Sequence, residues 1–183
     1  MGREIIFEVR ENNKPIWPNP DSIDATLFVC GRDDATNYIA QLIYNQIDEK
    51  LDANENLTRD DLQDSDYTIL LTSNDYNKYL KIKNNLQEYY DKDMKEIQKA
   101  KDTLEDLREA RRHTATIKDF EDFSDVMDET ESWIEDNDYS RAGSMIDYLN
   151  TCYSEMLALV NTDPSGDRQV VIERYKVAII LSE

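Results

Sequence analysis

The spacing of apolar residues predicts strands near both ends of the chain. Residues 3–10 and 66–72 are short runs rich in branched and aromatic side chains, which favours β-strands. Residues 168–182 extend the same pattern and predict one long strand, and residues 25–29 form a possible additional strand. The turn residues at 12–15 lead from the first strand into an extended, proline-containing loop.

Between these strands, apolar residues recur at three- and four-residue spacing, which predicts amphipathic helices. One helix begins after a cap at Asp33 or Asp34 and runs to about residue 51. Residues 74–112 contain no Gly or Pro and carry a heptad-like apolar stripe interrupted by Asp93, which is typical of a long helix packed along another. Thr116 is positioned to cap a third helix, and Asn137 and Asp138 suggest a break before a fourth.

This order of elements predicts an α+β fold. The expected architecture is a small mixed or antiparallel sheet of three or four strands, with a helical hairpin or three-helix insertion before the last strand. The predicted domains are a sheet domain from residues 1–73 and 164–183 and an inserted helical hairpin or bundle from residues 74–162. A chain of 183 residues is long enough to bury a core without disulfides or metals.

Charge narrows the range of partners. Forty Asp and Glu residues oppose 21 Lys and Arg residues, for a formal charge of −19. Such a surface repels nucleic acid phosphates and anionic membranes and attracts basic clefts. We therefore expect a protein partner with a basic surface, and no direct binding of nucleic acid or membrane. Solubility alone is the alternative explanation of the charge.

The residues needed for common catalytic sites are scarce. The only histidine, His113, lies at the expected C-terminal end of the long helix, where basic residues complement the helix dipole. The four glycines are far apart, which excludes a P-loop and a dinucleotide-binding fingerprint. The sequence therefore predicts a non-enzymatic protein with no catalytic residue and no cofactor. An enzyme that uses carboxylates with magnesium stays open as a lesser alternative.

One acidic stretch and two cysteines were candidates for other chemistry. Residues 52–60 resemble the start of an EF-hand loop, but Leu57 replaces the required glycine and Gln63 the bidentate glutamate, so no metal site is predicted. Cys30 and Cys152 have apolar neighbours in the sequence, which predicts buried free thiols and favours the reducing cytoplasm.

No apolar run approaches the length of a membrane span, and the N-terminus has no apolar signal region.

The most informative stretch is residues 119–138, where ten of twenty residues are acidic and none is basic. Like charges at helical spacing destabilise a helix, and the preceding helix avoids this by mixing in lysines. Uncompensated repulsion favours a face that binds a cationic partner; a simply solvated face is the alternative. The predicted partner-binding residues are Asp119, Glu121, Asp122, Asp125, Asp128, Glu129, Glu131, Glu135, Asp136 and Asp138.

Two large apolar residues lie beside the main apolar stripe of this acidic helix. Val126 and Trp133 are predicted to widen its buried face. The alternative is that they are exposed anchors within the acidic surface.

In overall character the chain resembles phage and mobile-element proteins, and among them anti-CRISPR proteins that act on Cas9-type nucleases. The features shared are small size, strong negative charge, a lack of catalytic motifs and a composition rich in Asn, Asp, Tyr and Lys. The resemblance implies an inhibitor that acts as a DNA mimic in the cytoplasm of a bacterial host, binding the basic channel of the nuclease and blocking DNA binding or cleavage. The alternative is a structural, assembly or adaptor protein whose helical hairpin forms a homodimer.

Overall fold

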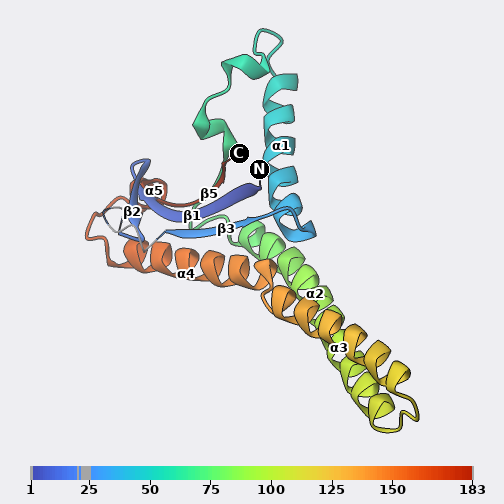
Figure 1. Ribbon diagram of the computed structural model, residues 1–183. Coiled ribbons are helices and arrows are strands. Elements are labelled where there is room, and N and C mark those ends of the chain that lie inside the picture. Colours follow the sequence, from blue (N-terminus) through green and yellow to red (C-terminus); the bar gives the residue numbers. More distant parts are fainter. Residues whose placement is uncertain (1, 20, 22–25, 183) are drawn as a thin grey trace. The chain divides into compact units, whose positions relative to one another are not determined.

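The computed structural model describes residues 2–19, 21 and 26–182 and has an α+β fold (Figure 1). The predicted class and the helical insertion before the last strand are confirmed. By its internal contacts the chain separates into two compact units, Met1–Gln87 with Arg141–Glu183, and Glu88–Ser140. The boundaries between these units lie at residues 87–88 and 140–141. The domain boundaries predicted from the sequence, near residues 73 and 163, stay a prediction.

The sheet is antiparallel and has five strands, where the sequence predicted three or four. Its order is β2-β1-β5-β4, and β3 also pairs with β1. The two central strands are aligned so that Phe7 lies opposite Ile179. The strands are β1 (Arg3–Glu11), β2 (Lys14–Trp17), β3 (Leu27–Gly31), β4 (Thr68–Leu71) and β5 (Tyr175–Ser182).

Strand β2 is the one that the apolar pattern did not predict. The turn before it is formed by Asn12 and Asn13, whose φ angles of 48° and 66° suit a tight two-residue β-hairpin. The sequence predicts that Pro15 belongs to a turn and extended loop, but it pairs with Arg10 next to a bulge in β1. Proline is tolerated there because β2 lies at the edge of the sheet and needs no donor on its outer side.

One face of the sheet is covered by helix α4 (Arg141–Thr162), which contacts β1, β3 and β5 (Figure 1). Ile5, Phe7 and Val9 alternate along β1 and are at most 1% exposed, as the twofold period of a strand requires. The Phe7 ring lies 6.1 Å from that of Tyr148 on α4. The residues that α4 buries are Ala142, Met145, Ile146, Leu149, Cys152, Tyr153, Met156 and Val160.

Helix α1 (Asp34–Asp52) matches the predicted range. Its N-cap is Asp33, whose carboxylate accepts a hydrogen bond of 2.8 Å from the Thr36 backbone N–H. The helix contacts β1, β3 and α4, and Ile39 and Ile43 are fully buried. Asp33 thus starts a helix that completes the core of the sheet unit.

Two short 3-10 helices, η2 (Arg59–Asp61) and η3 (Asp64–Tyr67), follow α1. Thr58 and Asp61 form a capping box at η2, in which the Asp61 carboxylate accepts from both the backbone N–H and the hydroxyl of Thr58. In the EF-hand-like stretch, the Asn54 side-chain oxygen accepts from the backbone N–H of Asn56 at 3.2 Å. This oxygen therefore serves a local turn.

Residues 168–174, predicted as the beginning of a long last strand, form helix α5 (Arg168–Arg174), so that prediction is wrong for them. The Asp167 carboxylate caps α5 by accepting from the backbone N–H groups of Gln169 and Val170. Val171 is fully buried on its inner face. The strand propensity of the valines is overridden by the cap and by this packing.

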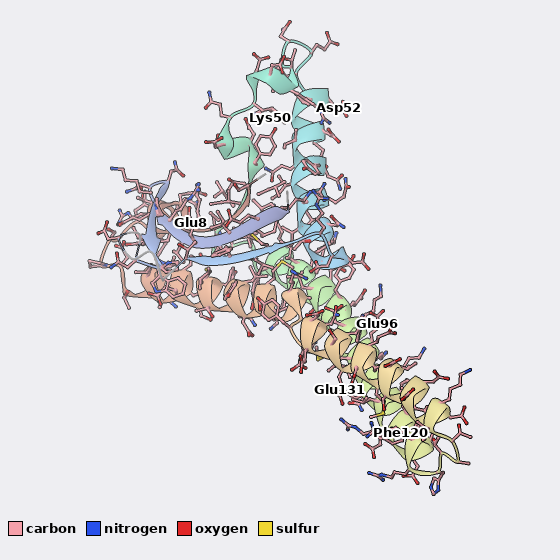
Figure 2. The ribbon with its side chains drawn as sticks, viewed as in Figure 1. Glu8, Lys50, Asp52, Glu96, Phe120 and Glu131 are labelled. Atoms are coloured by element: carbon pink, nitrogen blue, oxygen red, sulfur yellow. The ribbon has the colours of Figure 1, made fainter. Side chains whose placement is uncertain are left out.

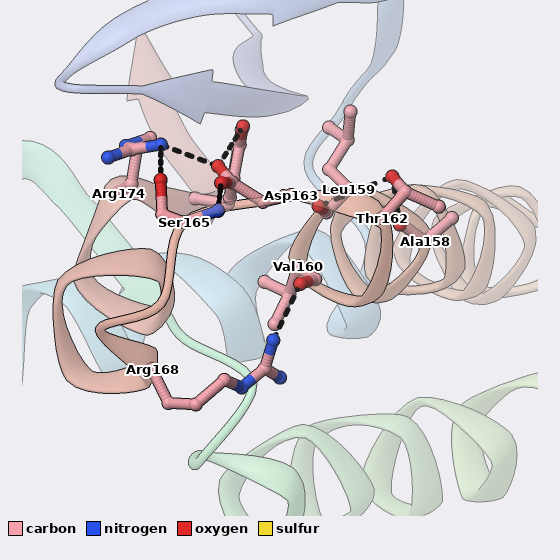
Figure 3. A network of polar contacts seen from close by, with 9 residues as sticks. Ala158, Leu159, Val160, Thr162, Asp163, Ser165, Arg168 and Arg174 are labelled. Carbon is pink, nitrogen blue, oxygen red and sulfur yellow. Dashed lines mark hydrogen bonds and ion pairs between the residues drawn. The ribbon is translucent and has the colours of Figure 1, made fainter.

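The turn between α4 and α5 is closed by Asp163, whose side chain is only 3% exposed (Figure 3). Its carboxylate accepts hydrogen bonds from the Ser165 backbone N–H at 2.9 Å, the Tyr175 hydroxyl at 2.8 Å and the Arg174 guanidinium at 2.5 Å. These donors, the Ser165 N–H first, hold the pKa of Asp163 well below its usual value of 3.8. Asp163 thereby joins the end of α4 to the start of β5.

The two cysteines differ in exposure. Cys152 is fully buried under the sheet, and burial raises the pKa of its thiol to about 12. Cys30 is exposed, so the prediction that both thiols are buried is wrong for it. On β3 the alternation of side chains buries Val29 and turns Cys30 to the opposite face, which α4 does not cover.

The remaining helices are α2 (Tyr76–Arg112) and α3 (Ile117–Asn137). The second compact unit consists of α3 and the part of α2 from Glu88 onward. Within this unit the two helices lie side by side as a hairpin (Figure 1). None of the described helices is both long and apolar enough to cross a membrane.

Candidate protein-binding surface

The hairpin is held together by a narrow apolar seam. Ile97 and Leu104 on α2 are 5% and 7% exposed, and Met127 on α3 is 4% exposed. The predicted heptad stripe on α2 is therefore confirmed as the packing seam. The predicted cap is confirmed as well, because the Thr116 hydroxyl oxygen accepts from the Asp119 backbone N–H at 3.1 Å and donates to the Asp119 carboxylate at 2.6 Å.

Asp93, which interrupts the apolar stripe, has a partner at the end of the hairpin opposite the turn at residues 113–116. Its carboxylate accepts a hydrogen bond of 2.7 Å from the hydroxyl of Ser140, which is only 9% exposed. A polar residue in the seam is satisfied there instead of being left unpaired. The bond joins α2 to the chain just after α3 ends.

The ten predicted partner-binding residues lie together along α3. Nine of them are exposed, Glu131 is partly exposed, and Asp138 forms the C-cap just after the helix. Phe120 and Glu131 mark two positions along this helix in Figure 2, and Glu96 marks the neighbouring α2. The set is a continuous surface of one helix.

Few of these ten carboxylates are neutralised by the protein itself. Among the described residues, the ion pairs of this set are Glu131 with Arg108 at 3.0 Å and Asp138 with Lys101 at 3.6 Å. All four side chains are at least 42% exposed, and such surface pairs contribute about 0–1 kcal/mol each. The surface therefore keeps most of its negative charge.

Four carboxylates form the side of α3 opposite the buried Met127. At 100° of rotation per residue, Asp122, Asp125, Glu129 and Asp136 fall within about 40° of that opposite direction. We call these four residues the outer acidic ridge.

Asp125 at the centre of the ridge has acidic neighbours at every helix-adjacent position. Glu121 and Asp122 precede it by four and three residues, and Asp128 and Glu129 follow it by three and four. Like charges at these spacings destabilise a helix by about 0.2–0.5 kcal/mol per pair. Folding of the hairpin gives no reason for this arrangement, whereas a cationic partner would relieve it.

The prediction that Val126 and Trp133 widen the buried face is wrong. They are 46% and 41% exposed, and Phe120 on the same helix is 49% exposed. The Arg111 guanidinium lies over the Phe120 ring, 5.2 Å from its centroid. Two helices cover only one narrow stripe of each other, and α4, which the sequence grouped with the hairpin, packs on the sheet instead.

Two hollows lie on the Val126 and Trp133 side of the hairpin, between α2 and α3. One, of about 460 Å³, is lined by Ala100 and Trp133 among others. The second, of about 590 Å³, is lined by Leu107 and Val126 among others. We call the two hollows together the flank groove. Sequence reasoning missed the groove because the apolar pattern does not reveal how many helices share a seam.

His113 lies at the end of α2 as predicted, and its side chain is 75% exposed. It is 2.9 Å from the carboxylate of Glu109, whose pKa is lowered by hydrogen bonds to His113 and Arg112. Within the described residues, no group of three or more His, Cys, Asp or Glu side chains is placed to hold a metal ion. The chemistry of this unit is that of a charged and partly apolar surface.

No protein-family model, no curated protein and no solved structure matches this chain. Functional inference therefore depends on the outer acidic ridge and the flank groove themselves.

Proposed function

We propose that the protein is a non-enzymatic inhibitor that binds through α3 to the basic, nucleic-acid-binding surface of another protein. The observation that carries this proposal is that nine of the ten carboxylates predicted to bind the partner are exposed. Two of the ten have ion-pair partners among the described residues. Carboxylates form charge-assisted hydrogen bonds with the same Arg and Lys side chains that bind phosphate, so an acidic helix can compete for a nucleic acid site.

The charge density of α3 supports mimicry of a nucleic acid strand. The helix has 21 residues, nine of them acidic and one, Lys118, basic. At a rise of about 1.5 Å per residue it is roughly 31 Å long, which gives about one net negative charge per 4 Å. One strand of B-DNA carries one charge per about 3.4 Å. A surface that binds DNA phosphates therefore meets a similar density of charge on α3.

For the target we propose a Cas9-type nuclease in the cytoplasm of a bacterial host. The resemblance of the sequence to anti-CRISPR proteins supports this choice, and so does the chemistry of such nucleases, whose channels for guide and target strands are basic. The inhibitor would occupy such a channel and block DNA binding or cleavage.

Cleavage of a DNA target by a Cas9–guide complex, measured against inhibitor concentration, tests the proposal. The test variant neutralises the outer acidic ridge with Asp122→Asn, Asp125→Asn, Glu129→Gln and Asp136→Asn. Exposed ion pairs contribute about 0.2–1 kcal/mol each, so losing four should weaken inhibition about fourfold or more. Inhibition by the wild type should also weaken as salt rises, because salt screens exposed charges.

A matched control removes the same charge elsewhere. Asp52→Asn, Glu55→Gln, Asp60→Asn and Asp64→Asn change four exposed carboxylates of the sheet unit. We expect this control to inhibit within about twofold of the wild type, since long-range steering alone is largely screened at physiological salt. A wild type without inhibitory activity would refute the nuclease as target, and a ridge variant equal to the wild type would refute the ridge as the contact.

A further inference from the structure

The flank groove has an apolar floor that the protein leaves open. Val126 and Trp133 are seven residues apart on α3, which places them on the same side of the helix two turns apart. Both are more than 40% exposed, although folding usually buries residues of this size. Large apolar side chains held at helical spacing on a rigid element are suited to act as anchors for a partner.

The α2 side of the groove combines small and larger residues. Ala100 and Ala110 line the two hollows, with Thr103 and Leu107 between them at a spacing of three and four residues. Residues at this spacing form one row along the helix, against which the ridges of another helix can pack.

The two hollows follow one another along the same pair of helices. On α3 one is lined by Trp133, Thr130 and Glu129, and the other continues with Val126, Asp122 and Asp119. From Trp133 to Asp119 the axial distance is about 21 Å, or nearly four turns. The dimensions suit one additional helix of roughly 14 residues, laid along the hairpin to complete a three-helix bundle.

The charges at the rims of the groove differ. The α3 rim is acidic, with Asp119, Asp122 and Glu129, whereas the α2 rim combines Glu96, Lys99 and His113. An incoming helix with basic residues along the edge next to α3 would complement this asymmetry. A second copy of the chain is a poor occupant, because each copy carries a formal charge of −19.

We propose that the flank groove is the docking site for an amphipathic helix of the partner protein. That helix places its apolar stripe on Val126 and Trp133 and its Lys or Arg residues against the α3 rim. The inference builds on the proposed function by naming the structural element that the basic partner contributes. It does not depend on the partner being a nuclease.

The probe is a synthetic helical peptide of about 16 residues, labelled with fluorescein, with Leu at helical spacing and Lys along one edge. A second peptide has Glu at every Lys position. By fluorescence anisotropy we expect the Lys peptide to bind at least tenfold more tightly than the Glu peptide. The double variant Val126→Gln and Trp133→Gln should weaken binding of the Lys peptide at least tenfold, while Ile117→Gln should not change it. Ile117 is 81% exposed on the same helix and lies outside the groove.

Two double variants distinguish binding at the acidic rim of the groove from general attraction to the negative charge of α3. Asp122→Asn with Glu129→Gln removes two rim carboxylates, and Glu121→Gln with Asp128→Asn removes two from the opposite flank of α3. We expect the first pair to weaken binding of the Lys peptide several-fold more than the second. Circular dichroism of each variant, matching the wild type, confirms that the helices are intact.

Three outcomes would overturn the inference. They are equal binding of the Lys and Glu peptides, unchanged binding to the Val126 and Trp133 double variant, and a wild-type dimer in sedimentation that this double variant converts to monomers. The last would assign the groove to a second copy. The peptide experiment contains no nuclease, so its failure would not refute the proposed inhibition of a nuclease. Asp125 and Asp136 of the outer acidic ridge do not line the groove, so variants of these two residues test the proposed function separately.

Discussion

Helices α3 and α4 are nearly equal in length, 21 and 22 residues, but they differ in what they bury. Helix α4 buries eight side chains, whereas α3 buries Met127. Helix α4 has two acidic residues, Asp147 and Glu155, whereas α3 has nine. The sequence of α4 is explained by the core that it forms, and the sequence of α3 is not. Surplus charge and exposed apolar residues on α3 are therefore the features to assign to binding.

The largest contrast should appear when each helix loses an apolar side chain. Leu149 on α4 is fully buried, so Leu149→Ala should lower the free energy of unfolding by about 2–5 kcal/mol through lost burial and a cavity. Val126→Gln on α3 should change it by less than about 0.5 kcal/mol, as exposed positions do. Urea unfolding followed by circular dichroism measures both. A loss at Val126 as large as that at Leu149 would make Val126 a core residue and remove the floor of the groove.

The carboxylates that follow the two helices differ in burial, and the pH dependence of stability tests the role of the buried one. Asp163 beyond α4 is nearly buried and hydrogen-bonded, whereas Asp138 beyond α3 is 66% exposed. Because folding lowers the pKa of Asp163 below 3.8, its ionised form stabilises the fold above that pH, and the contribution is lost as pH falls through the folded value. Asp163→Asn should therefore be destabilising at neutral pH, by less than Leu149→Ala.

Unfolding measured from neutral pH down through 3.8 checks this expectation. The difference in stability between the wild type and Asp163→Asn should shrink as pH falls below 3.8. A difference that stays constant with pH would mean that the Asp163 charge is not what holds the turn.

The start of α3 should depend on its cap, because little packing supports this helix. Thr116→Ala removes the side-chain acceptor for the Asp119 backbone N–H and should destabilise the hairpin by about 1 kcal/mol. Hydrogen exchange of the amides in the first turn of α3 should speed up accordingly. Thr103→Ala, inside α2, is the control and should leave that exchange unchanged. If both variants behave alike, the cap does not hold the first turn.

The smallest expected effect has the opposite sign. Asp125→Asn removes like-charge contacts with Glu121, Asp122, Asp128 and Glu129, and should stabilise the hairpin by a few tenths to about 1 kcal/mol at low salt. The gain should vanish near 1 M salt, where the screening length is about 3 Å. Glu96→Gln on α2, which has Lys92 four residues before it and Lys99 three residues after it, should give no gain. A destabilised Asp125→Asn would mean that the carboxylate has a structural role.

Local signals predicted the helices well. The heptad stripe of α2 and the caps at Asp33 and Thr116 are properties of residues three or four positions apart, so they can be recognised in the sequence and are confirmed. Strand β2 and helix α5 were missed because their local preferences are weak or contrary. Pro15 argues against a strand and the valines of α5 against a helix, and pairing with β1 and burial of Val171 decide the outcome.

The candidate site was predictable in its charge but not in its shape. The acidic residues of α3 can be counted in the sequence, and their exposure follows from helical periodicity. The exposure of Trp133 could not be predicted, because an apolar stripe shows which side of a helix is buried and not what covers it. The apolar stripe of α4 is covered by the sheet. The side of α3 that carries Trp133 is exposed.

The hydrogen bond between Asp93 and Ser140 has a consequence for how the hairpin can change in length. It fixes the register of the two helices at one end, whereas the turn at residues 113–116 closes the other end. Insertion of one heptad into α2 and one into α3, between Asp93 and Ser140, would preserve that register and extend the flank groove by about 10 Å. An insertion into one helix alone would shift the two seams against each other. Hairpins of different reach can therefore be engineered on an unchanged sheet unit.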